Sequence, residues 1–284
     1  MTSARDLLGL VKFSHSIFAL PFALVSAWVA AAGVPALDRL AWIVVCAVTA
    51  RTCAMATNRY VDRRLDAQNP RTASREIPRG AVSPRGASML AIGSGAAFLA
   101  SAWFLGPWCG ALAPPVLAVL VGYSFAKRFT AAAHLWLGAS LALAPLGAWV
   151  AVRGAPDGDV AVPLLLAFAV ATWVAGFDLI YACQDAEFDR ERGLHSVPAR
   201  FGTSTALRVS VLLHVVTVAA LAAFGARAEL GTWYWLALAA GAALLVWQHR
   251  IVRPDDLSRV DAAFFTANGW VGVALLAGVV ADLA

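Results

Sequence analysis

Charged side chains are scarce in this sequence. Of its 284 residues only 14% are Asp, Glu, Lys or Arg, while 61% are hydrophobic. An average soluble domain is about 25% charged and about 45–50% apolar, so the composition excludes an ordinary soluble globular protein. The net charge of +5 comes from residues beside apolar runs rather than from a soluble basic domain, so nucleic acid is not expected as a partner. We expect an integral membrane protein.

Cysteine and histidine are also few, and neither is clustered. The four cysteines form no Cys-x-x-Cys pair and no group with histidine, so the signatures of a zinc or dithiol site are missing. The five histidines lack the spacing of metal ligands. We expect packing or interface roles for all of them. They are Cys46, Cys53, Cys109, Cys183, His15, His134, His195, His214 and His249.

Short segments that alternate apolar and polar residues, the pattern of a membrane barrel, are missing too. The apolar residues come instead in continuous runs that are long enough for helices to cross a bilayer, which takes about 17 to 25 residues. We predict an all-α bundle of nine transmembrane helices, forming a single domain over residues 1–284. The predicted spans are 13–33, 40–58, 87–106, 108–126, 133–152, 160–182, 205–224, 231–249 and 262–283.

Lys and Arg are unequally distributed between the two ends of these spans. Most of them share one side, and only Arg39, Arg153 and Arg227 lie on the other. By the positive-inside rule, the N-terminus and the segments 59–86 and 183–204 are expected in the cytoplasm, with the C-terminus outside. An odd number of spans agrees with this orientation.

Two charged segments follow apolar runs that lie four spans apart. The second span runs into NRYVDRRLD at 58–66, and the sixth runs into DLIYACQDAEFD at 178–189. Similar endings on the same side of the membrane indicate an internal duplication. We therefore expect two four-helix repeats plus one further helix.

Oxygen-bearing side chains form a column in each of these segments. Asn58, Asp62 and Asp66 are spaced i, i+4, i+8, so on a helix they share one face and rise about 6 Å per step. Asp185 and Asp189 repeat the spacing. The sequence therefore predicts two acidic columns at the cytoplasmic ends of two helices.

Clustered carboxylates repel one another unless a cation lies between them. Oxygen ligands that are few per helix suit Mg²⁺, which takes its remaining ligands from water and substrate phosphates. Arginine and lysine beside the columns can bind phosphate oxygens. We interpret the two segments as a site for a metal-bound, polyphosphorylated substrate. The alternative is ordinary surface ion pairing, the commoner fate of an isolated acidic run.

These residues carry a resemblance to a known family. The segments Asn58-x3-Asp62-x3-Asp66 with RTASREIPRG, and GFDLIYACQDAEFDRERGLHSVPARFG at 176–202, resemble the two signature segments of the UbiA superfamily of intramembrane prenyltransferases. YSFAKR at 123–128 and HLWLGAS, which begins at residue 134, resemble its basic loop and the start of its fifth helix.

The sequence departs from the family pattern at two positions. Arg59 stands where many members have Asp after the Asn, and Ser124 where many have Pro after the Tyr. The first departure removes one possible acid and leaves the column of Asn58, Asp62 and Asp66 intact.

The resemblance implies a nine-helix bundle with a cytoplasm-facing cavity, in which two Mg²⁺ ions bridge the diphosphate of an isoprenoid donor. It implies metal ligands and diphosphate-binding residues by position. The implied metal ligands are Asn58, Asp62, Asp66, Asp185 and Asp189, and the implied diphosphate contacts are Lys127, Arg128, Arg71 and Arg75.

Three further residues are candidates for handling the acceptor. Arg51 lies about two turns before Asn58 on the same face, deep enough to be costly unless it is paired or useful. It either holds the carboxylate of an aromatic acid or pairs with Asp178 or a helix carbonyl. Asp178 and Tyr181 are candidates for orienting the acceptor or taking its ring proton.

The resemblance points to a Mg²⁺-dependent aromatic polyprenyltransferase of a prokaryotic inner membrane. Its expected substrates are a polyprenyl diphosphate and 4-hydroxybenzoate, or a dihydroxynaphthoate, in ubiquinone or menaquinone formation, with no obligate protein partner. One alternative is a non-aromatic acceptor such as a haem, a chlorophyll precursor or a glycerol phosphate. The other is an ion-coupled transporter, which usually places its acids near the bilayer midplane.

Overall fold

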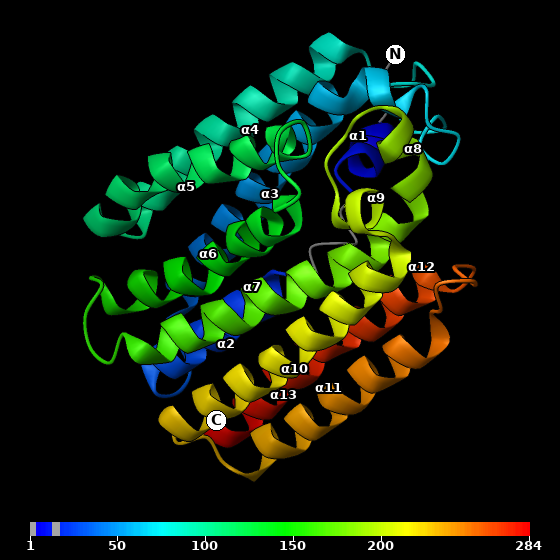
Figure 1. Ribbon diagram of the computed structural model, residues 1–284. Coiled ribbons are helices and arrows are strands. Elements are labelled where there is room, and N and C mark those ends of the chain that lie inside the picture. The colour runs from blue at the N-terminus through cyan, green and yellow to red at the C-terminus, as the bar shows by residue number, and fades with distance from the viewer. Residues whose placement is uncertain (1–3, 13–17) are drawn as a thin grey trace. The chain divides into compact units, whose positions relative to one another are not determined.

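The computed structural model describes residues 4–12 and 18–284 (Figure 1). Within these ranges the regular elements are all helices, and Arg253 and Asp256 form one isolated bridge. The helices are α1 (Ala4–Leu10), α2 (Leu20–Ala31), α3 (Leu37–Asp66), α4 (Pro84–Phe104), α5 (Pro107–Ala126), α6 (Ala133–Arg153), α7 (Ala161–Ala182), η2 (Cys183–Asp185), α8 (Ala186–Glu191), α9 (Val197–Phe201), α10 (Thr203–Arg227), α11 (Thr232–Ile251), α12 (Val260–Ala262), η3 (Ala263–Ala267) and α13 (Asn268–Leu283).

The all-helical membrane class predicted from the sequence is confirmed in the described part of the chain. Seven helices there are long and apolar enough to cross a bilayer. The predicted count of nine is not confirmed. α2 has 12 residues, which is too short to span alone, and residues 13–17 of its predicted span lie outside the described residues. α11 is not among the seven. The cytoplasmic N-terminus stays a prediction.

The contacts divide the chain into two compact units. Unit 1 comprises residues 41–125 with the described part of 1–16, and unit 2 comprises 126–284 with the described part of 17–40. α2, the first predicted span, therefore belongs to unit 2, so the units do not coincide with the predicted four-helix repeats. Those repeats, and the single domain over 1–284, stay predictions.

Unit 1 is built on the long helix α3. Near its start Trp42 stacks on Phe104 of α4, with ring centroids 4.4 Å apart. Cys46 Sγ lies 3.2 Å from Ser101 Oγ, so this cysteine has the packing role expected for it. Near the other end of α3, buried apolar residues join α1, α3 and the segment before α4. These are Leu10, Val11, Ala56, Ile77, Val82 and Ala87.

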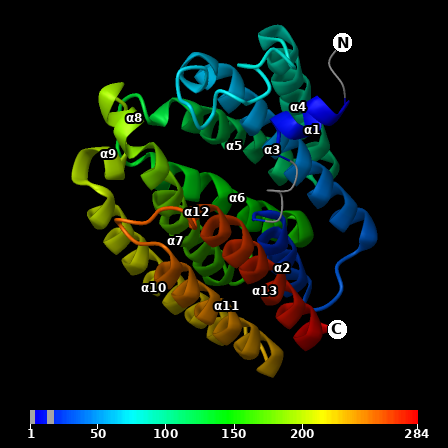
Figure 2. The ribbon, with the colours of Figure 1, turned by 90° about the vertical axis from the view of Figure 1, so that its right-hand side faces the viewer.

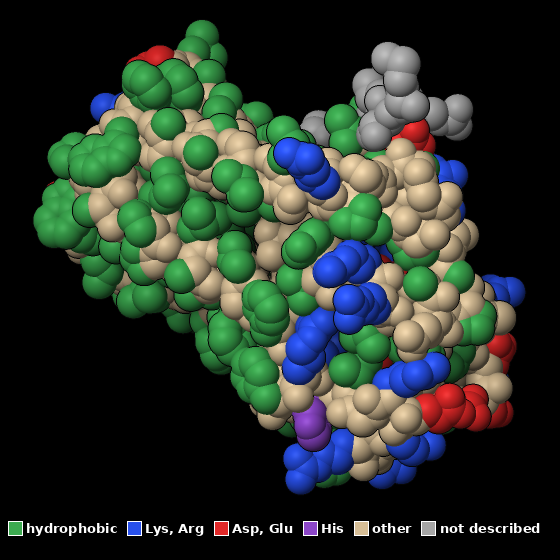
Figure 3. Space-filling model, turned by 90° about the horizontal axis from the view of Figure 1, so that it is seen from above, with side chains coloured by type: hydrophobic (Ala, Val, Ile, Leu, Met, Phe, Trp, Pro, Cys, Tyr) green, Lys and Arg blue, Asp and Glu red, His purple; other side chains and the backbone are tan. Residues whose placement is uncertain are grey.

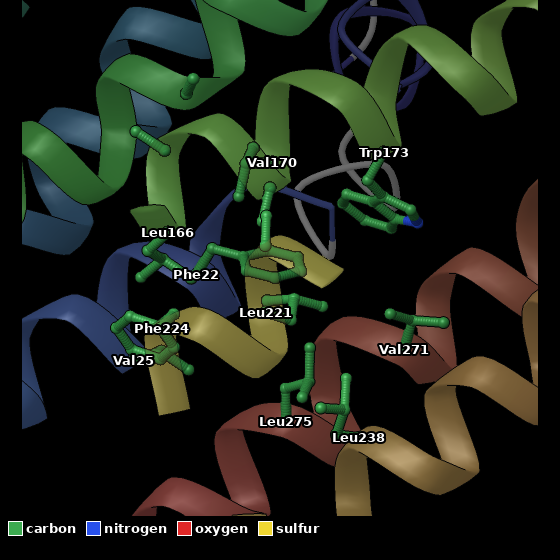
Figure 4. Close-up of a cluster of buried hydrophobic side chains, with 14 of the residues drawn as sticks. Phe22, Val25, Leu166, Val170, Trp173, Leu221, Phe224, Leu238, Val271 and Leu275 are labelled. Atoms are coloured by element: carbon green, nitrogen blue, oxygen red, sulfur yellow. The ribbon is translucent and has the colours of Figure 1, made fainter. Parts of the chain in front are cut away.

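Unit 2 is a bundle in which α7 is the most buried helix. α6 and α10 pack on α7, α11 packs on α13, and α2 packs on α6 and α13 (Figures 1 and 2). The sequence of α7 is apolar around nearly its whole circumference, as a buried helix requires. Figure 4 shows Phe22 of α2, Val170 of α7 and Leu275 of α13 converging in the core of this unit.

The outer faces of the helices are apolar. Large hydrophobic side chains such as Ile92, Leu212 and Trp270 are exposed, and apolar side chains cover much of the face seen in Figure 3. Exposure on this scale marks a surface that something else covers, and in a chain with seven candidate spans that surface suits lipid tails. The protein is a multi-pass membrane protein.

Candidate active site

The first predicted column lies on the last three turns of α3. The helix continues unbroken to Asp66, so Asn58, Asp62 and Asp66 share one face as their spacing predicts. Asn58 Nδ2 donates a hydrogen bond to Asp62 Oδ2 at 3.0 Å. The bond uses the amide nitrogen and leaves the Asn58 oxygen as an acceptor for a ligand. This end of α3 thus presents several oxygen atoms in a row.

The segment after α3 folds back and fixes Asp66. Arg75 Nη1 donates to Asp66 Oδ1 at 2.6 Å, and Thr72 Oγ1 donates to the Asp66 backbone carbonyl at 3.0 Å. Asp66 is only 6% exposed, and its Oδ2 has no hydrogen-bond partner. A buried carboxylate oxygen without a donor costs free energy, so this atom is suited to a cation.

The second column lies where α7 ends. The helix tightens into the 3-10 turn η2 and continues as α8, which contains Asp189. Asp185 and Asp189 are both buried, with 7% and 3% exposed. Asp189 Oδ2 makes no hydrogen bond, although Lys127 Nζ lies 3.8 Å from it. At Asp66, by contrast, Arg75 binds one carboxylate oxygen and the other has no donor.

Asp178 is paired with a histidine. His134 Nδ1 lies 2.7 Å from Asp178 Oδ2, which joins the start of α6 to the last turns of α7. His134 is 2% exposed, whereas the Asp178 side chain is 15% exposed. We expected His134 only to pack, and that expectation missed its contact with Asp178, a predicted site residue.

Backbone N–H groups at the junction of α8 and α9 bind both Lys127 and His134. The His195 N–H donates to the Lys127 carbonyl at 2.7 Å, and the Val197 N–H donates to His134 Nε2 at 3.4 Å. Ser196 between them caps α9 by accepting from Ala199 N–H at 3.3 Å. Residues 195–197 thus bind both the loop before α6 and the start of α6.

Tyr181 lies against an aromatic cluster. Its ring centroid is 4.5 Å from that of Phe264, which belongs to the π-helical turn η3. Asn268 stabilises that turn because its Nδ2 donates to the carbonyls of Ala263 and Phe264, while Oδ1 accepts from Trp173 Nε1 at 2.9 Å. The ring of Tyr181 thus packs against an aromatic cluster.

Arg51 contacts a backbone carbonyl outside the helices, so neither of its predicted roles is tested by this contact. Its Nη2 donates to the Lys12 carbonyl at 3.1 Å, just after α1. Its buried Nε has no hydrogen-bond partner, so one donor remains for an anion. Of the residues predicted to bind the diphosphate, Arg128 is exposed and Arg71 is partly buried.

The predicted metal ligands fit Mg²⁺ by chemistry. Within residues 4–12 and 18–284, no group of three or more His, Cys, Asp or Glu side chains could hold a metal ion. Mg²⁺ is usually bound through one or two carboxylates, with waters and substrate phosphates completing its coordination. Asp66 and Asp189 each offer one buried, unpartnered oxygen, which suits that mode of binding.

Residues 19–270 match the model of the UbiA prenyltransferase family. The chain belongs to this family. It is therefore an enzyme, a prenyltransferase, as the two acidic segments led us to expect.

Named relatives are similar to this prenyltransferase over most of its length. The 4-hydroxybenzoate octaprenyltransferase of Nitrosospira multiformis is 33% identical over 256 residues, which cover 90% of this chain and 86% of that protein. The enzyme of the same name from Pseudomonas aeruginosa is 34% identical over 264 residues, 91% of this chain and 86% of that protein.

Solved structures share the fold of this prenyltransferase. The apo structure of a UbiA homolog from Aeropyrum pernix K1 superposes with a TM-score of 0.86 at 34% identity, over 95% of this chain and 98% of that one. A UbiA homolog from Archaeoglobus fulgidus bound to DMAPP and Mg²⁺ superposes with a TM-score of 0.73 over 98% of this chain and 99% of that one. Its identity is 19%, so this second likeness shows the fold alone.

Three residues of this region were not singled out from the sequence. His134 was assigned to packing because a lone histidine has no ligand spacing. Val197 acts through its backbone N–H, which no side-chain pattern reveals. Gly138 packs α6 so closely on α7 that a Cβ atom there would overlap the Ala171 carbonyl. The sequence signal for His134 and Gly138 was in the stretch HLWLGAS. Its histidine and glycine are four residues apart, so on a helix they share one face.

Proposed function

We propose that this prenyltransferase moves a polyprenyl group from an allylic diphosphate to the ring of an aromatic acid. The acceptor is 4-hydroxybenzoate or a related dihydroxynaphthoate, and the product is a precursor of ubiquinone or menaquinone. The reaction takes place at a prokaryotic inner membrane, with the acidic segments on the cytoplasmic side. The names of the relatives support the acceptor class.

One observation carries the proposal. Each acidic segment ends in a buried aspartate that has one oxygen without a hydrogen-bond donor and a basic residue beside it: Asp66 with Arg75, and Asp189 with Lys127. Ordinary surface ion pairs are exposed and contribute little, whereas these carboxylates are buried. The combination suits a ligand that carries both a divalent cation and phosphate oxygens.

Each acidic segment contains candidate metal ligands. Asn58, Asp62 and Asp66 in unit 1, and Asp185 and Asp189 in unit 2, would bind Mg²⁺ directly or through water. Bound there, Mg²⁺ would neutralise the charge that grows on the diphosphate as it leaves.

The basic residues would stabilise the same developing charge. When the allylic C–O bond breaks, its electron pair stays on the diphosphate oxygen and the carbon becomes an allylic cation. Lys127 and Arg75 stand beside the carboxylates, and Arg71 and Arg128 are on the same segments, so their positive charges favour the departing anion. This interaction is stronger for the separated ions than for the intact ester, which is the condition for catalysis.

The acceptor would then be alkylated and lose a proton. A ring carbon next to the phenol oxygen supplies an electron pair to the allylic cation, and a C–C bond forms. The ring C–H bond at that carbon breaks, its electrons restore the aromatic system, and the proton goes to the Asp178 carboxylate. An apolar cavity would be needed to exclude water, which would otherwise quench the cation.

A pair of variants on one helix tests the acid columns. In membranes containing the protein, Asp189→Asn should lower prenyl transfer by at least about 100-fold, because it removes charge from a metal ligand. Glu187→Gln is the matched control, since Glu187 is exposed on the same short helix. Transfer is measured with a labelled allylic diphosphate and 4-hydroxybenzoate in Mg²⁺. Equal activity of the two variants, both folded, would show that Asp189 has no part in the reaction.

The depth of the acids disfavours a carrier. Asp66 is the last residue of α3, and Asp185 and Asp189 follow the end of α7. An ion-coupled carrier usually holds its acids near the midplane, within reach of both sides. Acids at helix ends suit a reaction on a water-soluble head group with an apolar tail in the membrane.

A further inference from the structure

His134 is placed to act on Asp178 rather than only to fill space. Its ring is almost fully buried at the second position of α6, and Nδ1 lies 2.7 Å from Asp178 Oδ2. The Asp178 side chain keeps 15% of its surface exposed. One carboxylate oxygen is thus bound to a buried ring, while the side chain as a whole remains accessible to a substrate.

The backbone of Val197 determines which nitrogen of His134 carries the proton. The Val197 N–H donates to His134 Nε2, and a backbone N–H can only donate. Nε2 must therefore offer its lone pair, and in the neutral ring the proton is then on Nδ1. It follows that Nδ1–H donates to Asp178 Oδ2, and that Asp178 accepts as a carboxylate.

This arrangement gives Asp178 a fixed orientation. A hydrogen bond to an ionised carboxylate is about twice as strong as one between neutral groups. With both ring nitrogens engaged, His134 has no lone pair available to pass the proton onward. Its role is to position Asp178, not to relay the proton.

We propose that His134, locked in its Nδ1–H tautomer by the Val197 N–H, is the positioning residue that holds Asp178 ready to take the ring proton of the aromatic acceptor. This inference rests on the proposed function. In the proton-transfer step the acceptor's ring C–H bond breaks, a new O–H bond forms at the second oxygen of Asp178, and the hydrogen bond from His134 is kept throughout.

The packing of α6 on α7 supports a specific placement. Gly138 is one turn after His134 on the same helix face, and there α6 meets the Ala171 carbonyl without room for a Cβ. Such close contact fixes the register of the two helices beside the pair. A histidine with a merely structural role needs a satisfied hydrogen bond, whereas this geometry also fixes its tautomer and the direction of the bond.

Two substitutions of similar size separate the positioning role from packing. His134→Asn places an amide N–H near the position of Nδ1, whereas His134→Gln places its amide near the position of Nε2. We expect kcat to fall by about tenfold to a hundredfold in His134→Gln, the effect of losing a hydrogen bond to a charged group. His134→Asn should retain most of the activity, and the KM for the allylic diphosphate should not change in either variant.

A kinetic isotope effect reports on the proton transfer itself. The assay uses acceptor deuterated at the ring carbon that is alkylated. When Asp178 is poorly held, proton removal becomes slower relative to ionisation of the donor, so the isotope effect on kcat should be larger in His134→Gln than in the native enzyme. Loss of packing alone would lower activity without increasing the isotope effect.

A second variant tests the tautomer without touching the histidine. Val197 is the first residue of α9, a position where proline is well tolerated, and Ser196 before it is extended, as the residue before proline should be. Val197→Pro removes the N–H that binds Nε2 and should lower kcat and raise the isotope effect in the same direction as His134→Gln.

The outcomes separate this inference from the proposed function. If the native enzyme forms no prenylated aromatic product, the proposed function fails and the role of His134 in that reaction fails with it. If the native enzyme is active and His134→Asn loses as much kcat as His134→Gln, or neither variant loses kcat, the positioning role is wrong. Recovery in His134→Asn together with the larger isotope effect in His134→Gln and Val197→Pro supports it.

Discussion

At the scale of single residues, each acidic segment contains a carboxylate oxygen that is buried without a hydrogen-bond partner. Asp66 Oδ2, Asp189 Oδ2 and Arg51 Nε all lack hydrogen bonds, although burying such groups unpaired is unfavourable. Two of them belong to the acidic segments, and the third lies two turns before Asn58. On the proposed function, a cation would satisfy the two carboxylate oxygens and an anion would satisfy the arginine nitrogen.

Arg51 allows a sharp test of how the acceptor is held. We predict that Arg51→Ala raises the KM for 4-hydroxybenzoate by about tenfold or more, because a hydrogen bond between charged groups is lost. The KM for the allylic diphosphate should change far less. Arg64→Ala, an exposed arginine near the end of the same helix, is the control. An unchanged acceptor KM in Arg51→Ala would leave Arg51 with only its structural contact to the Lys12 carbonyl.

At the scale of elements, glycine decides how closely α6 approaches α7. A side chain at Gly138 would meet the Ala171 carbonyl, whereas Gly147 on the same helix has open space around it. The ends of other helices are fixed by specific polar contacts. Asp282 near the end of α13 accepts from the N–H groups of Trp233 and Tyr234, which otherwise lack partners at the start of α11.

The glycine pair predicts a difference between two similar substitutions. Gly138→Ala should destabilise the protein by about 1–3 kcal/mol, as overpacking does, and should lower activity because His134 is one turn away. Gly147→Ala should be neutral or slightly stabilising, since alanine favours a helix more than glycine does. Thermal unfolding in detergent and prenyl transfer measure the two effects. Equal losses in both variants would contradict the close packing of α6 on α7.

At the scale of the whole molecule, composition and periodicity predicted the class of fold. The long apolar runs gave the positions of the helices, and the column spacing of Asn58, Asp62 and Asp66 was confirmed because α3 continues without a break. The first span was not confirmed at its predicted length, since α2 has 12 residues and its apolar residues pack within unit 2. Hydropathy does not distinguish a helix that faces lipid from one buried among other helices.

The polar contacts of the site were less predictable than its acidic columns. The pairing of Asp178 with His134 joins residues 44 positions apart, and the contact of Val197 with His134 depends on a backbone N–H. Such contacts arise from helix packing and loop conformation, which a single sequence does not specify. The phosphate contact of Arg75 stays a prediction, and in the structure this arginine binds Asp66.

The most direct test of the central claim is prenyl transfer by the native protein in lipid vesicles. The assay combines a labelled allylic diphosphate with 4-hydroxybenzoate, in Mg²⁺ or in excess chelator. We predict a labelled lipid product that contains the aromatic acid and that forms only with Mg²⁺. If folded protein with Mg²⁺ turns over no allylic diphosphate, with this acceptor or with a dihydroxynaphthoate, the assignment of the acidic segments to diphosphate ionisation is contradicted.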